Sequence, residues 1–214
     1  MSKPVCIFDL DGTLLNTLQD LANSTNAALA AVGLPQRSID EVRRFVGNGV
    51  RVLMRRAVPE GTDDSVYEAA YAQFLDVYAR EKAHYTCPYA GILETVQTLE
   101  TRGIRCAVLS NKNDDAVAAL CAQYFPGLFE WTQGMCDGFR PKPAPDALFA
   151  ICKRMNVSLE NVFYIGDSEV DVQTAAAAGV RLVAVTWGFR SREALLAAGA
   201  TTLIDRPEDL LAIL

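Results

Sequence analysis

Residues 5–13 read VCIFDLDGT, so four apolar residues run directly into two aspartates, a glycine and a threonine. A short apolar run of this kind predicts a strand that is buried in a sheet. Side chains two residues apart on an extended chain point the same way, so we expect Asp9 and Asp11 to project together. Gly12 allows the backbone to turn tightly and to approach a ligand closely. Taken alone, the two acids are better explained by a turn at the end of a strand.

Short apolar runs recur along the chain, and helical patterns lie between them. The further expected strands are 105–109, 162–165, Arg181–Val185 and the less regular 202–204. The expected helices are 92–102, Asp114–Tyr124, 146–155, 170–178 and 192–198. Strands that alternate with helices predict an α/β fold, with a Rossmann-like parallel sheet covered by helices on both faces.

One stretch interrupts this alternation. Between about residue 18 and residue 84 the sequence shows no strand pattern, and helices are expected at 18–32, Ile39–Phe45, 49–57 and Asp64–Glu81. A helical block inserted after the first strand of a parallel-sheet domain is typical of a lid. We therefore expect an α/β core domain that contains the active site, residues 1–15 and 86–214, and an inserted α-helical cap domain, residues 16–85.

The composition of the 214 residues excludes several classes of protein. Half of the residues are hydrophobic and 21% are charged, which excludes a disordered chain. A net charge of −6 argues against binding to nucleic acid or to an acidic membrane surface. Apolar runs are too short for a membrane span or a signal peptide. The six cysteines form no C-x-x-C pair, so we expect reduced thiols in a cytoplasmic protein.

Polar residues follow the second expected strand and occupy a stiff loop. Ser110 and Asn111 come directly after strand 105–109, where a hydroxyl and backbone amides at a helix start can bind an anion. Simple capping of the next helix would also explain them. Lys142 lies in RPKPAP, residues 140–145, whose prolines can hold one ammonium at a fixed place. The alternative is an ordinary solvated lysine.

The expected strand 162–165 ends in GDSEVD, residues 166–171. Asp167 and Asp171 are four residues apart, so a helical turn would place them on one side. Ser168 with Asp171 three residues later also fits a capping box, which would make Asp171 a device that starts a helix. Asp171 could serve both purposes.

The carboxyl ends of parallel strands share one edge of a sheet, where ligands bind. That edge should gather six side chains: Asp9, Asp11, Ser110, Lys142, Asp167 and Asp171. Four carboxylates together repel one another and raise their pKa values, so they stay ionised only if cations share the site. Lys142 supplies one positive charge, and Mg²⁺ with waters and a phosphate is the expected second cation. The single histidine, His84, argues against a zinc site and against a Ser-His-Asp triad.

The combination resembles the haloacid dehalogenase-like superfamily, in its phosphatase branch. The run DxDGT at residues 9–13 is similar to the first motif of that superfamily, Ser110 to the second, Lys142 to the third and GDxxxD at 166–171 to the fourth. The helical insert is similar to the small α-helical cap of the superfamily. Three segments resemble phosphoglycolate phosphatases in particular: FVGNGVR at 45–51, CPYAG at 87–91 and SNK at 110–112.

The resemblance implies a role for each acidic residue. Asp9 would be the nucleophile that forms an aspartyl-phosphate, and Asp11 the acid and then the base. Mg²⁺ would be bound by Asp9, by Asp167 and by the backbone carbonyl of Asp11. Asp171 would hold metal-bound waters or orient Lys142.

The resemblance also implies how the substrate is held. Ser110 and Lys142 would bind the phosphoryl oxygens. The remaining substrate-binding candidates in the core are Gly12, Thr13 and Asn111. In the cap, Arg51 and Asn48 come first as partners for a carboxylate of the substrate, followed by Arg43 and Arg44. An equally good interpretation of these arginines is that they are solvated helix charges.

The predicted function is therefore hydrolysis of a small organic phosphate monoester, with 2-phosphoglycolate as the first candidate. The alternatives within the superfamily are a sugar-phosphate phosphatase, a pyrophosphatase and a phosphoglucomutase-type phosphotransferase. A phosphorylatable receiver-like domain is the non-enzymatic alternative, because receivers also place carboxylates and a lysine at the edge of such a sheet. The expected partner is a small phosphorylated molecule, without nucleic acid or membrane, and the protein is expected to be a monomer or a homodimer.

Overall fold

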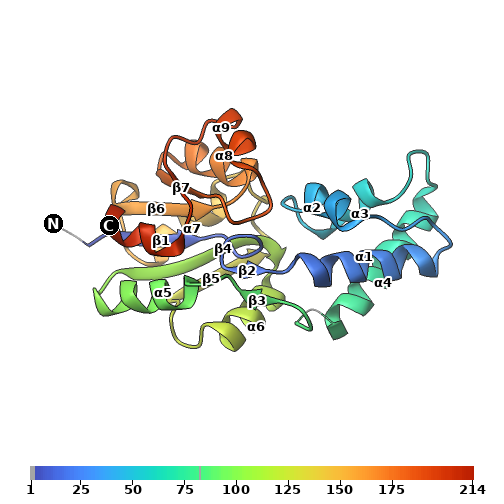
Figure 1. Ribbon diagram of the computed structural model, residues 1–214, viewed down its shortest axis with the longest axis horizontal. Coiled ribbons are helices and arrows are strands. Elements are labelled where there is room, and N and C mark those ends of the chain that lie inside the picture. The colour runs from blue at the N-terminus through green and yellow to red at the C-terminus, as the bar shows by residue number, and fades with distance from the viewer. Residues whose placement is uncertain (1–2, 82) are drawn as a thin grey trace. The chain divides into compact units, whose positions relative to one another are not determined.

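The computed structural model describes residues 3–81 and 83–214, and the chain divides into two compact units. The first unit, here called the core unit, comprises Met1–Leu15 and Pro88–Leu214. The second, here called the helical unit, comprises Asn16–Cys87. The strands lie in the first unit and at its two junctions with the second (Figure 1). These junctions are β2 (Leu15–Asn16) and β3 (Cys87–Pro88), which pair as a two-stranded sheet.

The core unit is built on a six-stranded sheet with the order β5-β4-β1-β6-β7-β8. All of its neighbouring strands are parallel. The strands are β1 (Val5–Phe8), β4 (Arg105–Asn113), β5 (Trp131–Met135), β6 (Val162–Gly166), β7 (Arg181–Val185) and β8 (Leu203–Ile204). This confirms the predicted Rossmann-like α/β fold and places β1, which carries Asp9 at its end, between β4 and β6.

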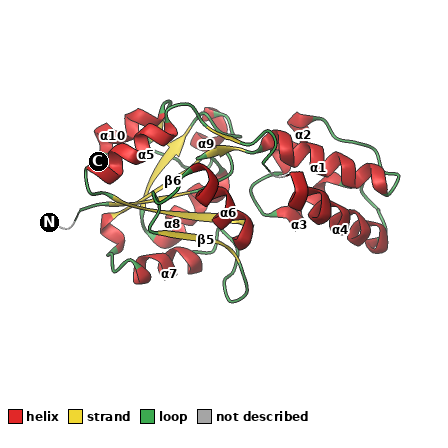
Figure 2. Ribbon diagram, turned by 90° about the horizontal axis from the view of Figure 1, so that it is seen from below, coloured by secondary structure: helices red, strands yellow, loops and turns green. Residues whose placement is uncertain are grey.

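Helices cover both faces of this sheet (Figure 2). They are α5 (Ile92–Thr101), α6 (Asp114–Tyr124), α7 (Asp146–Arg154), α8 (Glu169–Ala178), α9 (Arg192–Ala197) and α10 (Leu210–Ile213), with 3₁₀ turns at Leu159–Asn161 and Pro207–Asp209. Val5 and Ile7 of β1 share a buried cluster with Leu148 and Ile151 of α7. Because side chains alternate along a strand, the buried Cys6 and Phe8 face the other way, which fixes β1 from both sides.

Strand β5 was not expected from the sequence. Its residues, WTQGM, include a glutamine and a glycine, and they show no apolar run. The strand lies at the edge of the sheet and pairs only with β4 among the described strands, so a partly polar sequence suffices. Strand β4 is longer than expected, and its register with β5 shifts between Leu109 and Asn113.

The helical unit contains α1 (Leu18–Ala31), α2 (Ile39–Phe45), α3 (Val50–Ala57) and α4 (Asp64–Glu81). α2 begins at a capping box in which Ser38 and Glu41 exchange hydrogen bonds. α1 packs against α4, and the buried Asp20 of α1 accepts hydrogen bonds from the backbone N–H groups of Tyr85 and Thr86.

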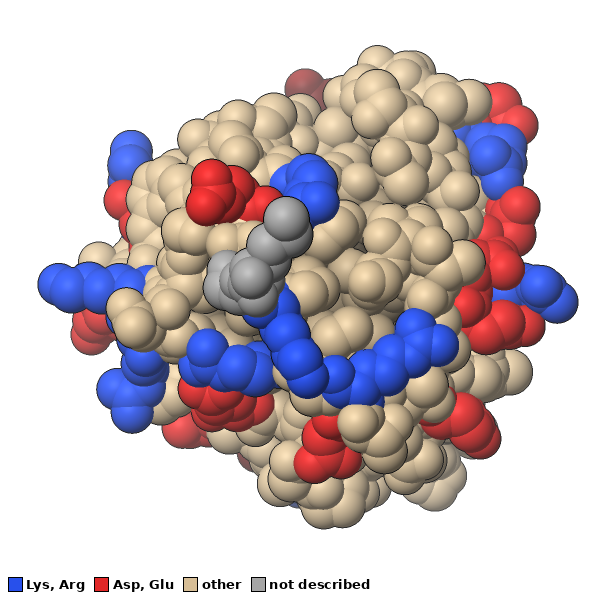
Figure 3. Space-filling view, turned by 90° about the vertical axis from the view of Figure 1, so that its left-hand side faces the viewer, with Lys and Arg blue, Asp and Glu red and all other residues tan. Residues whose placement is uncertain are grey.

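The described surface carries charges of both signs. Figure 3 shows Lys and Arg side chains beside Asp and Glu side chains over one face. Among the helices within residues 3–81 and 83–214, none is long and apolar enough to cross a bilayer.

Candidate active site

Strand β1 places Asp9 at the carboxyl edge of the sheet. The backbone N–H of Asp9 donates to the carbonyl oxygen of Ile165 at 2.8 Å, which continues the pairing of β1 with β6. Asp9 is buried, and its Oδ1 accepts from the backbone N–H of Leu10 at 2.7 Å. The same oxygen lies 3.0 Å from Nζ of Lys142.

Lys142 is the centre of a buried polar cluster. Its ammonium also donates to Asp171 Oδ1 at 2.7 Å and to the hydroxyl of Tyr164 at 2.9 Å. Three partners are thus available to the three protons of the ammonium. Burial alone would lower the pKa of Lys142, but the carboxylates of Asp171 and Asp9 outweigh burial and hold that pKa well above its ordinary value. Lys142 is therefore a permanent positive charge at this edge.

Asn111 fixes the loop that carries Lys142. Its Oδ1 accepts from the backbone N–H of Lys142 at 2.8 Å, and its Nδ2 donates to the carbonyl oxygen of Lys142 at 3.0 Å. The sequence suggested Asn111 as a substrate-binding residue, and in the structure its amide group holds the backbone of another site residue. Ser110 is buried beside it, and its Oγ accepts from the backbone N–H of Lys112 at 3.3 Å.

Asp171 takes part in both arrangements that the sequence allowed. Its Oδ2 accepts from the backbone N–H of Ser168 at 3.1 Å and from the hydroxyl of Ser168 at 2.6 Å, and the two residues form the capping box of α8. Its Oδ1 accepts from Lys142 and from Tyr164, the latter at 3.0 Å. The start of α8 and the position of the Lys142 ammonium are thus fixed by one carboxylate.

Asp167 is enclosed by two glycines. Its Oδ2 accepts from the backbone N–H of Phe189 at 2.7 Å, and its Oδ1 from the hydroxyl of Thr13 at 3.2 Å. A Cβ added at Gly12 would lie 2.3 Å from Asp167 Oδ2, and one at Gly188 would lie 2.3 Å from Asp167 Cβ. The two candidates Gly12 and Thr13 therefore contact the Asp167 carboxylate directly.

Three of these carboxylates form a close cluster. One oxygen from each of Asp9, Asp167 and Asp171 lies within 4.8 Å of the others. Burial and repulsion by Asp171 and Asp11, opposed by the attraction of Lys142, raise the pKa of Asp9 to about 7. Burial, then repulsion by Asp171 and Asp9, raises the pKa of Asp167 well above its usual value. One ammonium therefore does not balance the negative charge, and an all-oxygen donor set with this deficit suits Mg²⁺.

The carboxylate of Asp11 points to a different partner. Its two oxygens lie 2.8 and 2.9 Å from Nζ of Lys112, whose side chain is 3% exposed. The sequence alone gave Lys112 no role of its own. Its position in SNK, two residues after Ser110, was the feature that could have marked it as a site residue.

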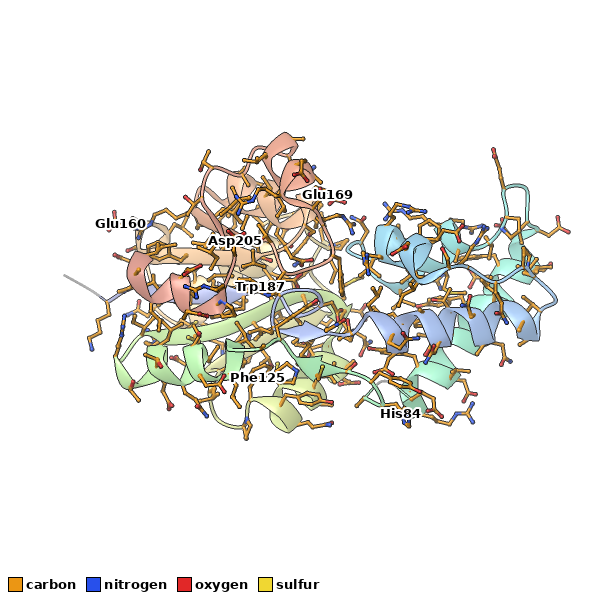
Figure 4. All side chains as sticks on the ribbon, in the orientation of Figure 1. His84, Phe125, Glu160, Glu169, Trp187 and Asp205 are labelled. Carbon is orange, nitrogen blue, oxygen red and sulfur yellow. The ribbon has the colours of Figure 1, made fainter. Side chains whose placement is uncertain are left out.

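The sequence alone also gave no role to two further residues of this region, Tyr164 and Trp187. Tyr164 lies in the middle of the apolar strand β6, where its hydroxyl is the only polar side-chain group and was the available signal. Burial, then repulsion by Asp171, raises the pKa of this hydroxyl well above its usual value, so it remains protonated and can donate. Trp187 donates its indole N–H to the carbonyl oxygen of Thr13 at 3.0 Å. Figure 4 labels Trp187 in the core unit and His84 in the helical unit.

The cap candidates lie in the helical unit and are bonded within it. Arg51 pairs with Glu68 at 3.0 Å, and its guanidinium lies 4.4 Å from the centre of the Tyr71 ring. Asn48 Oδ1 accepts from the guanidinium of Arg56 at 3.0 Å. Asn48 and Arg51 themselves lie in one short segment around the start of α3.

Comparisons with known proteins identify the family. The family model described as haloacid dehalogenase-like hydrolase matches residues 6–185. Phosphoglycolate phosphatase 1 of Pseudomonas aeruginosa is 36% identical over 211 residues, which cover 96% of this chain and 77% of that protein. Phosphoglycolate phosphatase of Pseudomonas syringae pv. tomato is 37% identical over 204 residues, or 93% of this chain and 75% of that protein.

Solved structures agree with this assignment. A protein of Lactobacillus delbrueckii subsp. bulgaricus, provisionally described as a phosphoglycolate phosphatase, superposes with a TM-score of 0.93 at 34% identity, covering 100% of this chain and 99% of that one. A protein of Haemophilus somnus with a similar provisional description gives a TM-score of 0.91 at 30% identity, covering 99% and 97%. The chain belongs to the haloacid dehalogenase-like hydrolase family, in its phosphatase branch.

Proposed function

We propose that this protein is a Mg²⁺-dependent phosphatase that hydrolyses 2-phosphoglycolate or a similar small phosphate monoester through an aspartyl-phosphate. The observation that carries the proposal is the buried cluster in which Lys142 lies within 3.0 Å of both Asp9 and Asp171, next to Asp167. This arrangement leaves negative charge for a divalent cation to balance. The names of the curated relatives supply the substrate class.

The residues of the core unit account for both steps of the reaction. A carboxylate oxygen of Asp9 attacks phosphorus, and the bond from phosphorus to the ester oxygen breaks as Asp11 gives that oxygen a proton. Asp11 then takes a proton from the water that attacks the aspartyl-phosphate, which releases inorganic phosphate and restores Asp9. Ser110 and Lys142 bind the phosphoryl oxygens throughout.

Mg²⁺, held by Asp9, Asp167 and the backbone carbonyl of Asp11, would offset the charge of the phosphoryl oxygens when bound. Asp171 serves this arrangement by orienting Lys142 through the contact at 2.7 Å. Lys142 and Asp171 are thereby set before substrate arrives, which is the condition for electrostatic stabilisation without rearrangement.

We further propose that the helical unit acts as a cap that excludes water during the reaction. Arg51 and Asn48 are its candidate contacts to substrate. For Arg51 to bind an anion, it would exchange its pair with Glu68, which is an exposed ion pair of small energy.

The direct test is phosphate release from a panel of substrates in Mg²⁺ buffer. The panel contains 2-phosphoglycolate, glucose 6-phosphate, pyrophosphate and para-nitrophenyl phosphate. The proposal expects repeated turnover, with the highest kcat/KM for 2-phosphoglycolate. A higher kcat/KM for a sugar phosphate or pyrophosphate would mean that 2-phosphoglycolate is not the preferred substrate. Labelling of Asp9 without turnover would favour a receiver-like domain.

A further inference from the structure

Lys112 is a buried ammonium to which the proposed reaction assigns no task. In that reaction Ser110 and Lys142 would bind the phosphoryl oxygens, and Mg²⁺ would offset their charge. Lys112 instead contacts both carboxylate oxygens of Asp11, the residue that would protonate the leaving group. If Asp11 meets the leaving oxygen, as proposed above, the Lys112 ammonium would lie on the leaving-group side of the site.

The backbone of Lys112 is held tightly, so this placement is set by the fold. It lies where the pairing of β4 with β5 changes register, and such irregularities re-aim side chains beside active sites. Gly134 of β5 approaches so closely that an added Cβ would lie 2.6 Å from the carbonyl oxygen of Lys112. The backbone N–H of Gly134 donates to Asp114 Oδ1 at 2.6 Å, which fixes the segment just beyond Lys112.

We propose that Lys112 determines specificity by binding a carboxylate attached next to the ester oxygen of the substrate. This inference rests on the proposed function, because it uses Asp11 as the acid that meets the ester oxygen. An acid in that role lies about 2.8 Å from the ester oxygen. The Lys112 ammonium lies 2.8 Å from the same carboxylate, and the carboxylate carbon of 2-phosphoglycolate is two bonds from the ester oxygen. One ammonium can therefore bridge Asp11 and the substrate carboxylate.

The substrate class that follows is a 2-phosphooxy carboxylate. A sugar phosphate offers a neutral hydroxyl or ring carbon at the same distance, which leaves the desolvated ammonium without an anionic partner from the substrate. Lys112 keeps Asp11 as its partner with either substrate, so the discrimination comes from the attraction that only the carboxylate of a 2-phosphooxy carboxylate adds.

The test compares two substrates in the Lys112→Met variant. Methionine keeps most of the length of the side chain and removes its charge. 2-Phosphoglycolate and ethyl phosphate differ chiefly in the carboxylate. Because Lys112 also contacts Asp11, both substrates should lose activity, but we expect kcat/KM for 2-phosphoglycolate to fall at least about 20-fold more than that for ethyl phosphate. Lys112→Arg should recover part of the loss on 2-phosphoglycolate. The exposed Lys153→Met is the matched control and should change neither value.

The outcomes separate the inference from the proposed function. An equal loss on both substrates, or no loss on either, would overturn the inference, because Lys112 would then only position Asp11 or do nothing. Wild-type enzyme that hydrolyses both substrates without preferring 2-phosphoglycolate would also overturn it while leaving the phosphatase intact. Absence of turnover with every phosphate in the wild type would remove both.

A binding measurement keeps the inference testable if Lys112→Met does not fold. In Asp9→Asn/Arg51→Ala protein, which retains Lys112 but lacks the Arg51 guanidinium and cannot form the intermediate, calorimetry measures affinity without turnover. We expect 2-phosphoglycolate to bind at least about 10-fold more tightly than ethyl phosphate. Equal dissociation constants would overturn the inference.

Discussion

Asp9 is both the candidate nucleophile and a source of instability. We expect Asp9→Asn to reduce turnover by more than about 1,000-fold, because an amide does not attack phosphorus. Burial and neighbouring carboxylates raise the pKa of Asp9 to about 7, so at pH 8 without metal the ionised side chain destabilises the fold. The variant should therefore melt no lower than the wild type in that buffer. Thermal melts and phosphate release test the two halves, and substantial residual turnover would place the nucleophile elsewhere.

Gly12 is the residue whose backbone leaves room for Asp167. Its φ is +88°, and an added Cβ would lie 2.3 Å from Asp167 Oδ2, so Gly12→Ala must displace that carboxylate. A displacement of about 1 Å at such a site costs on the order of 100-fold in kcat/KM. Gly127→Ala is the matched control, because φ there is +77° and nothing lies within 4 Å of the added Cβ. The control should lose about 1 kcal/mol of stability and keep its activity. Equal activity in both variants would contradict this role of Gly12.

At the scale of elements, Asp20 secures the start of α1 to the end of the helical unit. Its carboxylate is 1% exposed and accepts from the backbone N–H groups of Tyr85 and Thr86 and from the hydroxyl of Thr86 at 2.6 Å. Asp20→Ala leaves these donors without their acceptor and should lower the free energy of unfolding by about 2–4 kcal/mol. Urea denaturation followed by far-UV circular dichroism measures this change in the free energy of unfolding. Gln19 is the exposed neighbour of Asp20, and Gln19→Ala should cost less than about 0.5 kcal/mol. A similar loss of stability in the two variants would contradict this role of Asp20.

Elements with strong periodicity could be predicted from the sequence, and elements fixed by pairing could not. The buried strands β1 and β6 consist mostly of apolar residues, and β7 is apolar after Arg181. In α4 the buried residues Tyr67, Ala70, Phe74 and Tyr78 recur at helical spacing. Strand β5 pairs with β4 at the edge of the sheet. Its sequence, WTQGM, contains no apolar run that would predict a strand.

The same contrast holds for the candidate site. Asp9, Asp167 and Lys142 could be grouped because each follows a strand or lies in a stiff loop, and parallel strands end at one edge. Lys112, which contacts Asp11, lies where the register of β4 with β5 shifts. Tyr164 contacts Lys142, which is 22 residues away in the sequence. Neither contact follows from local spacing.

At the scale of the whole molecule, Mg²⁺ should stabilise the protein by an amount that grows with pH. With its pKa near 7, Asp9 in the metal-free fold keeps a proton that the unfolded chain releases above about pH 4. The stability of the metal-free fold therefore decreases as pH rises from about 4 to 7. Over the same interval Mg²⁺ binds more tightly, because it requires the deprotonated carboxylate.

Melting temperatures with and without Mg²⁺ at pH 5 and pH 8 measure this linkage. At a Mg²⁺ concentration about 100 times its dissociation constant, binding contributes about 2.7 kcal/mol. For a protein of this size that raises Tm by about 5–10 °C at pH 8, with a much smaller rise at pH 5. Asp167→Asn should abolish the rise, and EDTA should stop phosphate release in the wild type until Mg²⁺ is restored. An undiminished rise in Asp167→Asn, or one that shrinks as pH increases, would mean that Mg²⁺ is bound somewhere other than the buried carboxylates.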